Sequence, residues 1–243
     1  MKNLKICLTI FIAVVCYLNA SAQTVEEIIG KHVEALGGTD NITAVKTMKT
    51  VGFAKMMGME FPFTIYNVVP DKVYFELSVQ GKLIKQGFDG TIAWAVNPMG
   101  GSSTPEAVEG EEAGNIKERA KIFDKLTSYK DDGGSVELIG KEQVSNVETF
   151  KIKYTGSDGK SITYFVGSTD YLLVKTQRTL KIQGQEMESE TLYSNFKKAG
   201  DVMMAYSMDV KTKGSPMGTQ EISIDKYEMN PIVDEKIFSL PTK

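Results

Sequence analysis

Over most of the chain, hydrophobic and polar residues alternate with a period of two, as in β-strands that bury one face. Val73, Phe75 and Leu77, for example, alternate with more polar residues. The same alternation recurs at residues 61–65, 150–154, 162–166 and 204–210. Clusters of Gly, Asp, Pro and Ser separate these segments and mark turns. The pattern predicts about eleven strands, mostly joined by hairpins.

An antiparallel meander of that length has to curl or close in order to protect its edges. We therefore expect an α+β, mainly β, fold: one curved antiparallel sheet, or an unclosed β-barrel. No repeat, low-complexity tract or interdomain linker interrupts the chain, and we expect a single domain over residues 23–243.

A helix is predicted directly before the first strand. Thr24 and Glu27 have the spacing of a capping box, and the apolar residues that follow recur at helical spacing as far as Gly37. The sole histidine, His32, lies at the edge of this apolar stripe. Helix packing or capping is favoured over catalysis for it.

A helical insertion is predicted in the middle of the chain, over residues 104–129. Thr104 and Pro105 fit the N-cap and first position of a helix. The insertion should cover the sheet as a lid through an apolar face, and the flexible loop before it should act as a hinge. The lid residues are Ile116, Ala120 and Phe123, and the hinge residues are Gly100 and Gly101.

Residues 1–22 have the three parts of a cleavable signal peptide. Lys2 and Lys5 precede a short apolar run, and Ala20 and Ala22 give the small-x-small pattern before the cleavage point. The sequence therefore predicts export to the periplasm.

Charge and cysteine content narrow the range of functions. The formal net charge is −3 and no basic block is present, so nucleic acid is not an expected partner. Both cysteines, Cys7 and Cys16, lie within the signal peptide, so the mature chain should have neither a disulfide nor a thiol.

Candidate catalytic groups are few. With one histidine, no mature cysteine and no nucleophile-elbow motif, triad hydrolysis has no candidate. Paired carboxylates could act on an envelope glycan, but a solvated helix face and a turn account for those present. These acids are Glu109, Glu111, Glu112, Asp131 and Asp132. The sequence predicts no catalytic residue, and the protein is not expected to be an enzyme.

A methionine cluster could suggest a copper site, because thioethers bind Cu(I). Met56 and Met57 would, however, point to opposite faces of one strand, and His32 is distant in sequence. No metal site and no cofactor is expected.

Three local segments, in this order and spacing, resemble the lipoprotein-sorting carriers of the LolA/LolB superfamily, and the resemblance covers essentially the whole mature chain. They are residues 34–45, which lead into the first strand, residues 88–94, and the closing residues 230–241. The resemblance implies an unclosed barrel with an apolar concave face and a helical lid. In the carriers, that cavity takes the acyl chains of a lipoprotein crossing the periplasm. No individual functional residue can be transferred to this chain.

An acyl-chain site needs apolar surface that the protein's own side chains leave unfilled. The candidate cavity residues are Phe53, Met57, Phe61, Phe63, Ile65, Phe75 and Trp94. The alternative is that these residues simply fill the barrel. For Trp94, a core anchor and a cavity-wall position are equally compatible with the pattern.

The sequence therefore predicts a monomeric periplasmic carrier or binder of lipid or lipoprotein acyl chains in a Gram-negative envelope, with transient membrane contact. The alternative is a non-enzymatic module on the same scaffold that binds envelope protein partners.

Overall fold

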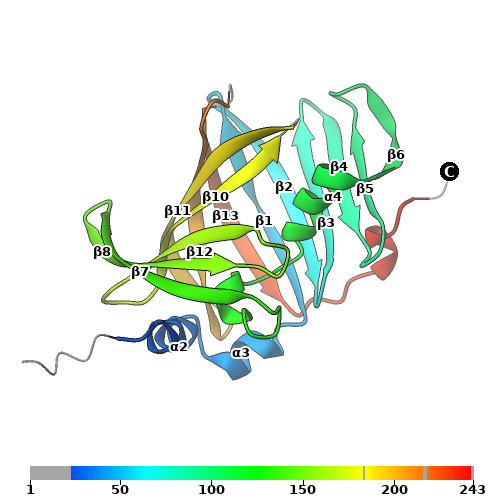
Figure 1. Cartoon of the computed structure of the whole chain (residues 1–243). Coiled ribbons are helices and arrows are strands. Elements are labelled where there is room, and N and C mark those ends of the chain that lie inside the picture. Colours follow the sequence, from blue (N-terminus) through cyan, green and yellow to red (C-terminus); the bar gives the residue numbers. More distant parts are fainter. Residues whose placement is uncertain (1–22, 183, 216–217, 242–243) are drawn as a thin grey trace, which may run out of the picture.

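The computed structural model describes residues 23–182, 184–215 and 218–241, so the expected signal peptide lies outside the described range. Within these residues, 13 strands form one antiparallel sheet (Figure 1). The strands are β1 (Thr47–Met56), β2 (Met59–Val68), β3 (Lys72–Val79), β4 (Lys82–Phe88), β5 (Ala93–Asn97), β6 (Ser102–Val108), β7 (Ser135–Val144), β8 (Val147–Thr155), β9 (Ser161–Gly167), β10 (Leu173–Ile182), β11 (Gln185–Ala199), β12 (Val202–Thr212) and β13 (Thr219–Met229).

The sheet consists of two meanders, β1–β6 and β7–β13, which meet where β1 pairs with β13. Strands β6 and β7 follow one another in the chain but form the two opposite edges of the sheet. Residues 109–134, which join them, therefore have to cross the hollow side of the curved sheet from one edge to the other (Figure 1). This crossing segment brings side chains over the concave face.

Five short helices accompany the sheet in the described residues: α2 (Val25–Ala35), α3 (Thr39–Ala44), α4 (Gly110–Glu118) and the 3-10 helices η2 (Lys125–Thr127) and η3 (Glu235–Phe238). The predicted capping box is confirmed. The main-chain nitrogen of Glu27 donates to the Thr24 hydroxyl at 3.2 Å, and the Glu27 carboxylate accepts from the Thr24 nitrogen at 3.1 Å. Helix α2 buries Ile28 and Ile29 against the second meander.

Helices α4 and η3 cover opposite faces of β3–β5. Ile116 and Ala120 pack with Val73 and Phe88 on the concave face. Trp94 points the other way, because it is the neighbour of an inward-facing alanine on β5.

The curved, mainly β fold predicted from the sequence is confirmed, although the strands are more numerous than expected. The predicted helix start at Thr104 is wrong, because Ser102–Val108 is the edge strand β6. Pro105 is tolerated there because an edge strand needs fewer ladder hydrogen bonds and because the β5–β6 register shifts nearby, between Ala95 and Asn97.

The predicted helical insertion 104–129 also ends earlier than its apolar periodicity indicates, since α4 stops at Glu118. An extended chain covers about 3.3 Å per residue and a helix only about 1.5 Å, so irregular backbone spans the hollow with fewer residues. The apolar face expected on one helix is instead divided among three clusters. Ile116 belongs to the cluster between α4 and the sheet, Phe123 to the cluster near α3, and Leu126 to the cluster under α2.

Candidate functional site

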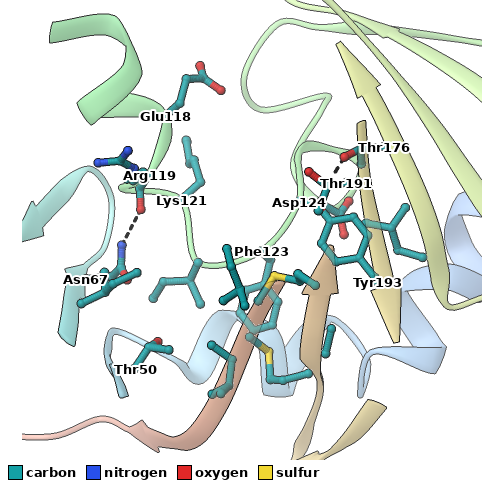
Figure 2. A pocket seen from close by; sticks show the side chains of 18 of the residues that line it. Thr50, Asn67, Glu118, Arg119, Lys121, Phe123, Asp124, Thr176, Thr191 and Tyr193 are labelled. Carbon is teal, nitrogen blue, oxygen red and sulfur yellow. Dashed lines mark hydrogen bonds between the residues drawn. The ribbon is translucent and has the colours of Figure 1, made fainter. Parts of the chain in front are cut away.

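A partly open cavity of about 680 Å³ lies on the concave face, between the two meanders. Its volume is within the range of roughly 300–1,000 Å³ that is usual for small-molecule sites. Strands of both meanders form its walls, and residues 118–125 cross it (Figure 2). Its apolar wall includes Met48, Met56, Phe63, Ile65, Phe75, Leu77, Ile84, Phe123, Phe196, Met204, Met208, Ile222, Ile224 and Tyr227.

Strand register explains why these residues share one wall. Tyr227, Thr50, Ile65, Phe75 and Gln86 form one continuous row across β13, β1, β2, β3 and β4. All five line the cavity. The alternation of apolar residues along each strand thus becomes a sheet-wide apolar surface with a few polar groups.

Methionine is prominent in this wall, where Met48, Met56, Met204 and Met208 all contribute side chains. Thioether side chains are flexible and polarisable, so they adapt to ligands of different shape. The cavity is therefore suited to a flexible apolar ligand.

The crossing segment is anchored to the sheet by Asn67 on β2, which is 2% exposed. Its side-chain Nδ2 donates to the carbonyl of Arg119 at 2.7 Å, as Figure 2 shows, and also to the carbonyl of Ala120 at 3.2 Å. These two carbonyls follow the end of α4, where helix geometry leaves such groups unpaired. Beyond this anchor, Phe123 lies in the cavity wall.

A second anchor ties the same segment to α2 through His32, whose side chain is 0% exposed. Its Nδ1 lies 2.7 Å from the main-chain oxygen of Tyr171, and its Nε2 lies 3.0 Å from Oδ2 of Asp124. Because both partners can accept, the two contacts fit a protonated ring, in which each nitrogen carries a proton and donates.

Burial opposes this charge, but the carboxylate of Asp124 and the carbonyl of Tyr171 outweigh burial, so the pKa of His32 is raised. The other carboxylate oxygen of Asp124 accepts from the nitrogen of Leu126 at 3.0 Å and so caps η2. The His32–Asp124 pair therefore holds α2 and the crossing segment together.

The acidic residues considered for glycoside hydrolysis lie away from the cavity. Glu109, Glu111, Glu112 and Asp131 are exposed, and none lines the cavity. Asp132 accepts hydrogen bonds from Lys121 and Ser128, which hold the pKa of its carboxyl below the ordinary value despite partial burial. The described residues hold no group of three or more His, Cys, Asp or Glu side chains placed to bind a metal ion.

None of the helices in residues 23–241 that the structure describes is both long enough and apolar enough to cross a bilayer.

Three of the seven candidate cavity residues, Phe63, Ile65 and Phe75, lie in the cavity wall. Phe61 shares their face of β2 but is 8% exposed and packs outside the lining. A role of Phe63, Ile65 and Phe75 in ligand binding remains a prediction.

The cavity positions predicted for Phe53, Met57 and Trp94 are wrong. Phe53 has the opposite parity on β1 to the lining residues and is 37% exposed, and Met57 lies in the β1–β2 turn and is 75% exposed. Trp94 is 1% exposed on the outer face, where its indole nitrogen donates to the carbonyl of Phe238 at 2.7 Å. Alternation shows which residues share a face, but not which face becomes concave.

Of the predicted lid residues, Phe123 lines the cavity, whereas Ile116 and Ala120 are buried against the sheet. The predicted hinge at Gly100 and Gly101 is wrong, because both glycines lie in the β5–β6 hairpin turn. Asn97 closes this turn by accepting from the nitrogen of Gly100 at 3.0 Å. Strand β6 separates the turn from α4, so it cannot act as the hinge of the crossing segment.

Several polar residues of the cavity were not predicted from the sequence: Asn67, Arg119, Asp124 and Arg178. Two signals could have identified some of them. Asn67 is a polar residue at an inward position of an apolar strand, and Arg119 and Arg178 are the only two arginines in the chain.

No protein-family model matches the chain, and no curated protein sequence does either. Solved structures do show similar folds. A LolA superfamily protein from Nitrosomonas europaea is 12% identical, with a TM-score of 0.60 over 90% of this chain and 98% of its own. A DUF1329 family protein from Desulfovibrio piger is 13% identical, with a TM-score of 0.60 and the same two coverages.

A domain from Vibrio parahaemolyticus named for outer membrane lipoprotein sorting is 10% identical, with a TM-score of 0.55 over 87% of this chain and 94% of its own. At these identities the similarity shows the fold alone. The LolA-like fold expected from the sequence is confirmed, and a cavity lies on its concave face.

Proposed function

We propose that the protein is a non-enzymatic carrier or binder of lipid or lipoprotein acyl chains in the cell envelope. The observation that carries the proposal is the cavity of about 680 Å³, whose apolar and thioether wall the protein's own side chains leave unfilled. The similarity of the fold to a LolA superfamily protein and to a lipoprotein-sorting domain supports the same scaffold use. The signal peptide expected at residues 1–22 would place the protein in the periplasm.

The energetics of such a site are favourable. Each methylene removed from water stabilises the complex by about 0.8 kcal/mol, so a chain of a dozen carbons contributes roughly 10 kcal/mol before ordering costs. Those costs consume part of this free energy, and what remains is enough for reversible binding. A carrier needs affinity of this kind, because it has to release its cargo.

Native mass spectrometry of the mature protein, purified from its own envelope fraction, tests the proposal directly. We expect a bound mass that organic extraction removes and that is identified as a lipid or an acylated peptide. An empty protein that also fails to bind acyl probes after delipidation would overturn the proposal.

A matched pair of variants localises the binding. Phe123→Asp places a carboxylate in the cavity wall, whereas Phe53→Asp makes the same change on the outer face. We expect Phe123→Asp to weaken binding of a fluorescent acyl probe by about tenfold or more, since a buried charge opposes apolar contact. Phe53→Asp should leave the affinity near that of the parent. Equal loss in both variants would exclude the cavity as the site.

The alternative function, a protein-interaction module, has one structural observation in its favour. Strands β6 and β7 are edges without a neighbouring strand in the described residues, and an extended peptide could pair with either. A co-purifying protein together with an empty cavity in the same native mass spectra would favour this alternative.

A further inference from the structure

The chain has 28 basic residues, of which only Arg119 and Arg178 are arginine, and both line the cavity. They come from opposite sides of it. Arg119 caps the end of α4 over the first meander, and Arg178 lies on β10 in the second meander. Two guanidinium groups from residues 59 positions apart in sequence thus line the same cavity.

The other charged side chains in the cavity wall each have a partner of opposite charge. The pairs are Lys125 with Glu118 at 2.8 Å, His32 with Asp124 at 3.0 Å, and Lys121 with Asp132 at 3.2 Å. The acids that line the cavity are therefore already neutralised and are not available to balance the arginines.

The two arginines have no such partner. Among the described residues, no carboxylate forms a salt bridge with Arg119 or Arg178. Arg119 donates to the neutral side-chain oxygen of Gln86, and its guanidinium carbon lies 4.9 Å from the ring centroid of Phe75. These contacts orient the guanidinium without neutralising it.

Arg119 and Arg178 are both solvent-exposed residues of the cavity wall. Neighbouring protein nevertheless displaces part of the water around the Arg119 guanidinium. This desolvation and the charge of Arg178 hold the pKa of Arg119 below its usual value. An arginine still remains protonated at neutral pH, because its intrinsic pKa is so high. A ligand anion between the two side chains would relieve their repulsion.

We propose that the ligand is an anionic lipid, whose carboxylate or phosphate head group is bound jointly by Arg119 and Arg178 while its chain occupies the apolar part of the cavity. The proposal rests on the acyl-chain function proposed above and specifies the class of ligand. Arginine is suited to this role because its planar fork binds the two oxygens of a carboxylate or phosphate at once.

The test uses two probes that differ only in head-group charge: dansyl-labelled undecanoic acid and its methyl ester. Their affinities are measured with the mature protein, with Arg119→Gln, Arg178→Gln and the double variant, and with Lys153→Gln. Lys153 is exposed on β8 and lies outside the cavity, so this control removes the same charge elsewhere. The charge-retaining variant Arg119→Lys separates charge from fork geometry.

We expect the parent protein to prefer the acid over the ester by about tenfold, which corresponds to one charge-assisted contact. The double variant should lose this preference while it keeps its affinity for the ester, which also shows that it is folded. Lys153→Gln should behave as the parent does. Inorganic phosphate or acetate at millimolar concentration should not displace the acid probe.

Four outcomes would overturn the inference. Equal affinity of the parent for acid and ester would refute it and leave the acyl-chain function intact, as would an acid preference that survives in the double variant. Displacement by inorganic phosphate would show a site for free anions rather than for a lipid head group. Failure of both probes to bind would overturn the inference together with the proposed function.

Discussion

The imidazole of His32 and the carboxylate of Asp124 form a 3.0 Å ion pair across 92 positions of sequence, with the ring fully buried. The pair joins α2, at the start of the described chain, to the segment that crosses the cavity. Since the other ring nitrogen contacts the carbonyl of Tyr171, the His32 ring connects three separate parts of the structure.

Stability should therefore depend on the charge of this one side chain. The pKa of His32 is raised in the folded protein above its ordinary value of 6.5, so the folded state holds the proton more tightly than the unfolded chain does. The resulting stabilisation is fully present below pH 6.5 and is lost as the pH rises through the folded-state pKa. Chemical denaturation at a series of pH values from mildly acidic to mildly alkaline would measure this decline.

Two variants assign the pH dependence. His32→Gln removes the titrating group and leaves Asp124 unpaired, and we expect a loss of about 3 kcal/mol together with a flatter pH profile. Asp124→Asn retains an oxygen that can cap η2 but removes the charge that raises the pKa of His32. Burial then lowers this pKa, so the decline of stability with rising pH should disappear or reverse. No other histidine is present in the chain to cause such a slope. A slope that persists in both variants would refute the assignment.

The anchor on β2, Asn67, should control how firmly the crossing segment is held. In Asn67→Leu, the carbonyls of Arg119 and Ala120 lose their buried donor, which should lower the free energy of unfolding by about 1–3 kcal/mol. Amide exchange in residues 119–124 should accelerate because the segment opens more often. Hydrogen-exchange mass spectrometry measures both the extent and the location of the change.

Asn115→Leu is the matched control for this variant, since it makes the same chemical change at an exposed position of α4. It should leave exchange in residues 119–124 unaltered. Similar protection in Asn67→Leu and in the parent would show that α4 and η2 hold the segment without Asn67.

The two anchors also show what could and could not be predicted from sequence. Period-two alternation and turn residues were sufficient for the curved antiparallel sheet, because each strand carries its own pattern. The capping box at Thr24 was readable for the same reason, since its partners are three residues apart. Asn67 and Arg119 are 52 residues apart, and nothing local to either residue reveals the contact.

The errors have a common physical origin. Helical spacing was recognised correctly between Ala113 and Ile116, but its continuation to Phe123 is overridden because the chain has to span the hollow between two sheet edges. Likewise, Phe53 and Phe63 both alternate as strand residues should, yet only the curvature of the assembled sheet decides that Phe63 faces the cavity. Both the end of the helix and the choice of the concave face therefore depend on tertiary structure.

The outer-face position of Trp94 makes a spectroscopic prediction. As the only tryptophan, buried on the face opposite the cavity, it should give an emission spectrum that does not shift when an acyl ligand binds. A second tryptophan introduced by Phe123→Trp in a Trp94→Phe background should shift on binding, because position 123 lines the cavity. Fluorescence titration of the parent and of this single-tryptophan variant compares the two positions.

Trp94→Phe alone should cost about 1–3 kcal/mol of stability, because the buried carbonyl of Phe238 loses its donor. Its affinity for the ligand should match that of the parent. A ligand-dependent shift in the emission of Trp94 in the parent protein would contradict the outer-face placement.

The turn at Gly100 and Gly101 should affect stability but not ligand release, unlike the Asn67 anchor. Gly101 has a φ of 94°, and a Cβ placed there would meet nothing within 4 Å, so Gly101→Ala introduces backbone strain without a steric clash. We expect it to lower stability by about 1 kcal/mol, as is usual for a side chain in left-handed backbone.

Because this turn joins β5 to β6 and does not flank the crossing segment, the rate of acyl-probe release from Gly101→Ala in stopped-flow experiments should equal that of the parent. Asn67→Leu, by contrast, should accelerate release, since it frees the segment that crosses the cavity. If Gly101→Ala changed the release rate as much as Asn67→Leu, the β5–β6 hairpin would have to move with the cavity, and the assignment of gating to residues 119–124 would fail.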